Sequence, residues 1–116
     1  MVYAWGYFYA TAKGDQSVCG VGGCLYLSED HWFSVKAGIG EGTNNFAELS
    51  AIRLLPRLIL EHEERSLHIF GDSQIIIKWI SSQNNIHNVR LVPLVEEVHR
   101  LIDRLEKVEI KHIYRE

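Results

Sequence analysis

The first forty residues of the sequence alternate between two kinds of side chain. In "VYAWGYFYATA" aromatic and small residues repeat with a period of two, and "GVGGCLYLS" and "HWFSVKAGI" follow the same pattern. Short polar breaks, "KGDQS" and "ED", separate the three segments. A period of two is typical of strands, because successive side chains point to opposite faces of a sheet. The pattern therefore predicts three strands joined as an antiparallel meander.

After "GEGTNN" the period changes to that of a helix. In "FAELSAIRLLPRLILEHEE" an apolar stripe follows helical spacing, formed by Phe46, Leu49, Ile52, Leu55 and Ile59. Pro56 falls inside this segment. Because proline lacks a backbone donor and crowds the preceding turn, it predicts a kink or a split of the helix at that point.

The second half of the sequence alternates strands and helices. "SLHIF" predicts a short buried strand, and "SQIIIKWISSQ" a helix capped by Asp72 or Ser73. "VPLVEEVHRLIDRLEK" predicts an amphipathic helix starting near Pro93, and "VEIKHIY" a last strand. The order β-β-β-α-β-α-α-β indicates a mixed α/β sheet whose later strands are parallel and covered by helices.

Composition narrows the class of protein. A chain of 116 residues, 47% of them hydrophobic, is long enough for one core, so we expect a single domain over residues 1–116. The net charge of -3 gives no general attraction to nucleic acid, and any such contact must be local. No apolar run approaches the roughly 20 residues that span a bilayer, and the first residues do not resemble a signal peptide. We therefore expect a soluble intracellular protein of the cytoplasm or nucleus.

The cysteines and histidines offer no obvious chemistry. Cys19 and Cys24 have an odd spacing within a predicted strand, which places them on opposite faces and argues against a disulfide. Two free, partly buried thiols are the prediction. The six histidines show no spacing typical of metal ligands.

Two carboxylates stand at the starts of predicted helices. Asp72 follows the strand "SLHIF" and Gly71, where it can cap the next helix or reach a ligand crevice at the carboxyl end of the strand. Taken alone, this position favours the cap. Glu48 lies near the start of a helix, after Asn44 and Asn45, which can cap that helix. Taken alone, Glu48 is typical of a solvated acid.

Taken together, four stretches resemble the ribonuclease H family in the right order: "KGDQSVCGVGGCLYLS", "GTNNFAELSAI", "IFGDSQIIIKWI" and "VEIKHIYRE". The resemblance covers nearly the whole chain and is closest to the domain of plant retrotransposon polyproteins. It implies an RNase H-like fold: a five-stranded mixed sheet, an antiparallel three-strand meander followed by two parallel strands, with helices packed on it. It also implies four clustered carboxylates that bind two divalent cations, Mg²⁺ or Mn²⁺, and cleave the RNA strand of RNA–DNA hybrids.

The resemblance also implies roles for particular residues. Glu48 and Asp72 match the second and third family acids, and would be catalytic metal ligands. The groove that grips the hybrid by its A-like shape and 2′-hydroxyls would be formed by Lys13, Gly14, Thr43, Asn44, Asn45, Ser73 and Gln74.

Two departures from the family pattern alter this expectation. Where the family has an aromatic followed by Asp-Gly, this chain has Phe8, Tyr9 and Ala10, so a phenol replaces the first acid. A phenol is neutral at pH 7 and a poor magnesium ligand. After "HIYRE" the family continues with an Asn and an Ala-Asp pair opening a final helix, whereas this sequence ends at Glu116. We therefore expect the fourth acid and the final helix to be absent.

Three functions compete at this point. A catalytically inactive descendant that binds protein or nucleic acid is favoured over an active endonuclease, because the main metal ligands are incomplete. A structural protein with no measurable hybrid affinity is the third. Scattered lysines predict weak hybrid binding at most. Without the final helix, apolar surface of the sheet would be uncovered, and large exposed apolar patches usually mark an interface. We therefore expect a second copy, as a homodimer, or a protein partner to cover this surface.

Overall fold

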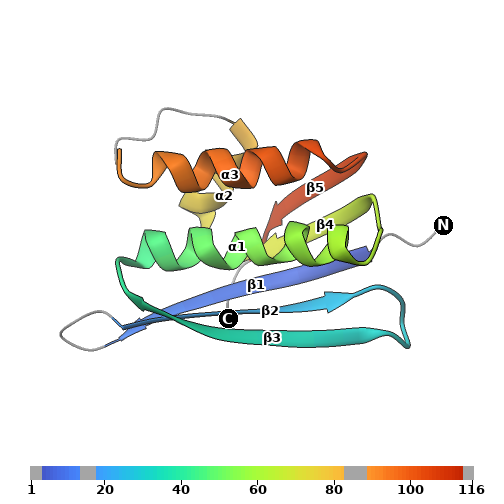
Figure 1. The fold of residues 1–116 in the computed structure, drawn as a ribbon, viewed down its shortest axis with the longest axis horizontal. Helices are drawn as coiled ribbons and strands as arrows, with labels where there is room; N and C mark the ends of the chain where they lie inside the picture. The colour runs from blue at the N-terminus through green and yellow to red at the C-terminus, as the bar shows by residue number, and fades with distance from the viewer. Residues whose placement is uncertain (1–3, 14–17, 83–88, 114–116) are drawn as a thin grey trace.

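The computed structural model describes residues 4–13, 18–82 and 89–113, which form one five-stranded sheet and three helices (Figure 1). The element order is the one that the sequence predicts. The strands are β1 (Ala4–Lys13), β2 (Val18–Tyr26), β3 (Trp32–Glu41), β4 (Ser66–Gly71) and β5 (Lys107–His112). The helices are α1 (Asn44–Glu61), α2 (Gln74–Ser82) and α3 (Val92–Asp103).

The sheet has the predicted mixed topology. Its strand order is β3-β2-β1-β4-β5, with β1, β2 and β3 antiparallel to one another. Strand β4 runs parallel to β1, and β5 runs parallel to β4. Strands β3 and β5 are therefore the two edge strands of the sheet. Both the meander and the later parallel pair are confirmed.

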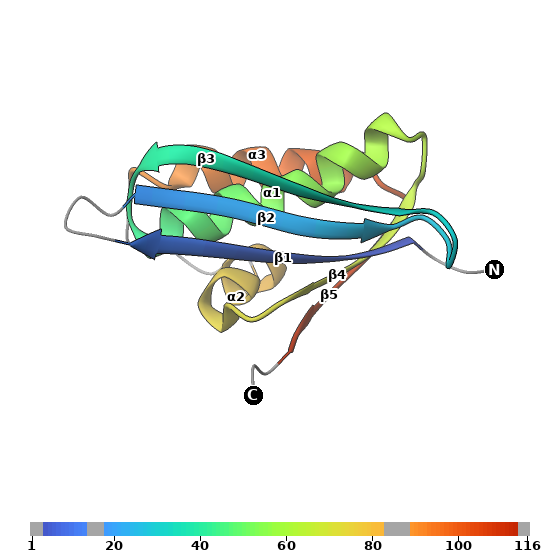
Figure 2. The same ribbon diagram turned by 90° about the horizontal axis from the view of Figure 1, so that it is seen from below.

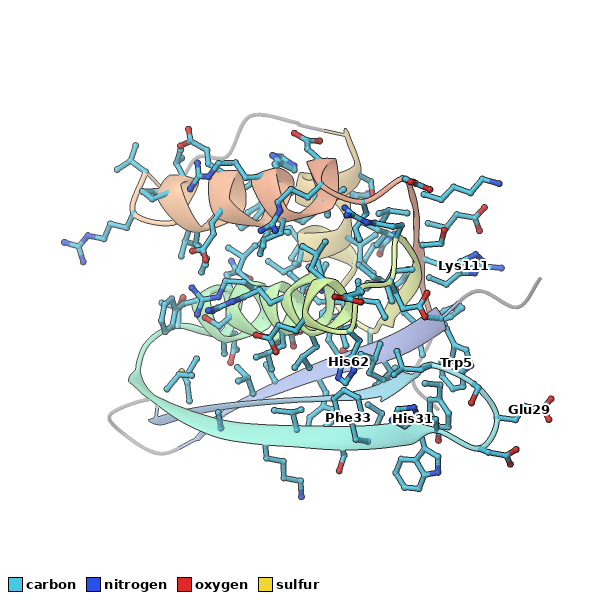
Figure 3. The ribbon with its side chains drawn as sticks, turned by 45° about the vertical axis from the view of Figure 1, so that its right-hand side comes forward. Trp5, Glu29, His31, Phe33, His62 and Lys111 are labelled. Carbon is cyan, nitrogen blue, oxygen red and sulfur yellow. The ribbon has the colours of Figure 1, made fainter. Side chains whose placement is uncertain are left out.

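One face of the sheet forms the core with the helices. Phe8, Leu67 and Ile69 point from the strands toward α1, whose Ile52 and Leu55 are fully buried. Near the carboxyl end of α1, the rings of Phe33 and His62 lie with their centroids 5.2 Å apart (Figure 3). Seen from below, β1, β2 and β3 lie in front of α1 and α3 (Figure 2). The face that we call the outer face is the one turned away from α1.

Helix α1 departs from its predicted form in two respects. It runs from Asn44 to Glu61 as one helix, with Pro56 buried inside it, so the split that proline allowed does not occur. Its N-cap is Thr43, whose hydroxyl accepts a hydrogen bond of 3.1 Å from the backbone amide of Phe46. The two asparagines expected as caps are instead the first two residues of the helix. A Thr at this position satisfies one of the amides that every helix start leaves open.

Two further features concern the cysteines and the helices. Cys19 is buried and Cys24 half-buried, and no disulfide joins them. Within the described ranges, no helix combines the length and apolarity needed to cross a bilayer.

Candidate functional site

The segments that carry the predicted site residues begin or end near the carboxyl ends of three strands. Because β1, β3 and β4 run in the same direction, their carboxyl ends lie at the same end of the sheet, and α1 starts there (Figure 1). Carboxyl ends of neighbouring strands are the usual place for a ligand crevice in α/β sheets. The arrangement brings the start of α1 and the β4–α2 turn to the same end of the molecule.

The β4–α2 turn holds Asp72 in a fixed backbone geometry. The ring nitrogen Nε2 of His112 lies 3.1 Å from the backbone oxygen of Asp72, and the amide of Ile113 donates to the oxygen of Gly71 at 2.9 Å. Ser73 directly precedes α2, and its backbone oxygen accepts from the amide of Ile77. The backbone therefore places Ser73, one of the two predicted caps, at the N-cap position of α2.

Glu48 lies in α1 between two buried residues, Ala47 and Leu49. Its side chain is half-buried, and the carboxylate oxygen Oε2 is removed from solvent. The loop before it is tied to the sheet, since the thiol of Cys19 contacts the backbone oxygen of Gly42 at 3.3 Å. This places Glu48 close to the helix start, as predicted, but less solvated than the sequence alone suggests.

Tyr9, at the place of the first acid, points to the outer face. A β-carbon built on Gly22 of β2 would overlap Cζ and Oη of Tyr9, so the ring lies directly over this glycine. Gly22 in turn pairs with Lys36 of β3. A hollow of about 430 Å³ opens there, lined by Tyr9, Gly20, Val21, Lys36, Ala37 and Gly38.

Tyr9 and Asp72 nevertheless occupy neighbouring places in the backbone. Phe8 pairs with Gly71 in the parallel β1–β4 ladder, Tyr9 is the next residue of β1, and Asp72 is the first residue after β4. A carboxylate at position 9 would therefore stand beside Asp72. In this chain the position holds a phenol.

The described donors do not fit a site for two divalent cations. Such a site needs several oxygen ligands from carboxylates around each ion. Over the described ranges, no group of three or more His, Cys, Asp or Glu side chains is arranged to hold a metal ion. By the resemblance to the ribonuclease H family, Glu48 and Asp72 are the two expected family acids within the described ranges.

The predicted binding residues are mostly accessible. Thr43, Asn44 and Gln74 are exposed, whereas Asn45 and Ser73 are half-buried. Lys13 is the last residue of β1. Gly14 lies outside the residues that the structure describes.

The outer face carries a group of aromatic rings that the sequence analysis did not predict. Trp5, Tyr7 and Tyr9 alternate along β1, and their register partners bring Tyr26, Trp32 and Phe70 to the same face. The period-two pattern of "WGYFY" already indicated that these rings share a face. The pattern within one strand does not show which residues of the other strands pair with it, so it could not predict the whole group.

Comparison with family models matches residues 8–116 to the family described as Reverse transcriptase-like. No curated protein matches the chain in sequence.

Solved structures give strong matches in fold. RNase H1 from the halophilic archaeon Halobacterium salinarum superimposes with a TM-score of 0.87 at 21% identity, covering 97% of this chain and 86% of that chain. The N-terminal RNase H domain of a Mycobacterium tuberculosis protein, fused to maltose-binding protein, gives 0.89 at 16% identity, with coverage of 98% and 88%.

A third structure was solved with a ligand. LC11-RNase H1, isolated from compost by a metagenomic approach, was determined in complex with an RNA/DNA hybrid. It gives a TM-score of 0.84 at 19% identity and covers 97% of this chain and 86% of that chain. At such identities the likeness establishes the fold, and activity has to be argued from the site.

Proposed function

Because the chain belongs to the Reverse transcriptase-like family and has an RNase H-like fold, we propose that it binds RNA–DNA hybrids weakly without cleaving them. The observation that carries this proposal is the placement of Tyr9. Its ring packs over Gly22 on the outer face, and it brings no carboxylate to the place beside Asp72. The function that follows is that of a non-catalytic RNase H-like domain.

Loss of cleavage follows from the chemistry of the reaction. Two cations must position and acidify a water and stabilise the leaving oxygen, and both tasks depend on a complete set of oxygen ligands. A neutral phenol does not supply the missing negative charge. The alternative is an active endonuclease that uses Mg²⁺ or Mn²⁺ held by Glu48, Asp72 and ligands from elsewhere.

Retained hybrid binding is supported by the segments around the two helix starts. Thr43, Asn44 and Gln74 are exposed and offer hydroxyl and amide groups. Such groups can contact the 2′-hydroxyls and sugar edges of an A-like duplex, which is how proteins read this shape. LC11-RNase H1, which has the same fold, was solved with an RNA/DNA hybrid.

Weak affinity follows from the charge of the chain. The net charge is -3, and non-specific affinity for nucleic acid comes mainly from cations that neutralise phosphates. Dissociation constants in the range of roughly 10⁻⁴ to 10⁻⁶ M at physiological salt are therefore expected.

Fluorescence anisotropy with a labelled hybrid tests this proposal. The double variant Asn44→Ala with Asn45→Ala should weaken binding, whereas Ser81→Ala, an exposed position at the far end of α2, should leave it unchanged. Equal binding by both variants, or no binding by the natural sequence, would contradict the proposed groove.

A further inference from the structure

The outer face of the sheet differs in composition from the face that packs on the helices. The described side chains on the inner face are mainly aliphatic or small, among them Val21, Leu25, Leu67 and Ile69. Among the outer-face strand side chains that the structure describes, there is no leucine, isoleucine or valine. Aromatic rings, glycines and lysines hold most of these places, and Cys24, Ser34, Ser66, His68 and Glu109 hold the others.

Three of these rings form a continuous stack across the meander. The centroids of Trp5 and Tyr26 lie 4.1 Å apart with an interplanar angle of 6°. Tyr26 and Trp32 follow at 5.6 Å and 23°. The stack ends at Trp32, on the edge strand β3, and this side chain is 55% exposed. An open ring at the end of a stack is a surface on which a further flat ring can lie.

Cations surround the rings on the same face. Lys36 lies beside the hollow at Tyr9, and Lys107 and Lys111 lie on the other edge strand, β5. Figure 3 shows Trp5 and Lys111 on the same side of the molecule, with Glu29 at the tip of the β2–β3 turn. Strands β3 and β5 are four spacings apart, or about 19 Å.

Acidic groups on this face are fewer. Among the described side chains of the strands, Glu109 is the carboxylate of the outer face, and its Oε2 lies 3.4 Å from Nε2 of His68. Over the described strand positions of this face, lysines therefore outnumber carboxylates, although the whole chain carries a net charge of -3. Local positive charge with exposed aromatic rings suits a polyanion that carries flat bases.

We propose that the outer face binds single-stranded nucleic acid. Bases stack on the exposed ring of Trp32 and on neighbouring rings, and Lys36 and Lys111 contact phosphates on either side. A second copy of the chain is the competing occupant. We favour nucleic acid because the described side chains of this face are aromatic and basic rather than aliphatic, and because its lysines complement the charge of phosphate. The site is separate from the proposed hybrid groove at the helix starts.

Anisotropy with a labelled oligo-dT or oligo-U of about twelve nucleotides tests this inference. Trp32→Ala should weaken binding roughly ten- to hundredfold, because one stacking partner is lost. Lys36→Ala should reduce the slope of log K against log salt by about 0.7, as expected for one lost phosphate contact on a single strand. Quenching of tryptophan fluorescence by the oligonucleotide should disappear in large part in Trp32→Ala.

Two matched controls separate the site from general surface effects. Val89→Ala removes an exposed apolar side chain in the turn before α3, and Ser81→Ala changes an exposed side chain at the far end of α2. Both should bind like the natural sequence. Because position 32 is exposed at an edge, Trp32→Ala should fold, which circular dichroism checks.

Three results would overturn the inference. One is that the natural sequence does not bind the oligonucleotide, and another is that Trp32→Ala binds it unchanged. The third is a dimer in sedimentation that Trp32→Ala dissociates while no oligonucleotide binds, which would assign the face to a second copy. The Asn44→Ala and Asn45→Ala variant should bind the single strand normally, so this proposal and the hybrid groove can fail independently.

Discussion

The ring of Tyr9 covers the α-carbon of Gly22 on the neighbouring strand, leaving no room for a β-carbon at that glycine. Phe8, one residue earlier, covers Gly71 in the same way on the inner face. On each face of β1, an aromatic ring thus packs over a glycine of a neighbouring strand. The direction of Tyr9, away from α1, is a consequence of this packing.

Gly22→Ala should destabilise the fold by about 1–3 kcal/mol, because the added methyl group forces the Tyr9 ring to move. Gly38→Ala is the matched control, since a β-carbon at Gly38 would meet no atom within 4 Å. Chemical denaturation of both variants gives the comparison. In a Tyr9→Ala background the penalty of Gly22→Ala should disappear, and its persistence would contradict the packing described here.

Thr43→Ala should cost about 1 kcal/mol of stability, because it removes the hydroxyl that accepts from the amide of Phe46. Asn44→Ala should cost much less, since Asn44 is already inside the helix. Urea titration followed by circular dichroism measures both. A larger loss of stability for Asn44→Ala than for Thr43→Ala would mean that an asparagine, and not Thr43, caps α1.

Glu63→Gly should stabilise the protein by about 1 kcal/mol, because Glu63 adopts φ 62° after the end of α1, a conformation that glycine adopts without strain. Glu64→Gly should give no such gain. Thermal unfolding of the two variants measures the change in stability. Destabilisation by Glu63→Gly would mean that its side chain contributes more than the backbone strain costs.

Tyr9→Asp should raise the affinity for Mn²⁺ roughly tenfold or more, because it adds a carboxylate at the place next to Asp72. Tyr9→Phe should leave the affinity unchanged. Isothermal titration calorimetry measures both. If Tyr9→Asp binds no better than Tyr9→Phe, the identity of residue 9 is not what limits metal binding.

The periodicity of the sequence predicted the order of all eight elements and the mixed sheet, because each strand and helix carries its own local pattern. The cap of α1 was harder to predict, since Thr43 and the asparagines are adjacent and all are good caps. Pro56 allowed a kink or a split, and packing of the surrounding helix against the sheet maintains a single helix.

For the candidate surfaces too, the sequence indicated individual residues but not which of them lie together. Glu48, Asp72 and Tyr9 were picked out by resemblance to a family, and their neighbours in space came only from the structure. The sequence alone does not group the lysines, because Lys36 and Lys111 are far apart in it. The register of β1 with β2 and β4 places them on one face, and no local pattern encodes such long-range pairing.

Cleavage of a labelled RNA–DNA hybrid, with Mg²⁺ and then with Mn²⁺, tests the central claim most directly. The natural sequence and Glu48→Gln, prepared in parallel, should both leave the RNA strand intact, because Tyr9 leaves the set of metal ligands incomplete. Cleavage by the natural sequence that Glu48→Gln abolishes would contradict this, and would show an active endonuclease.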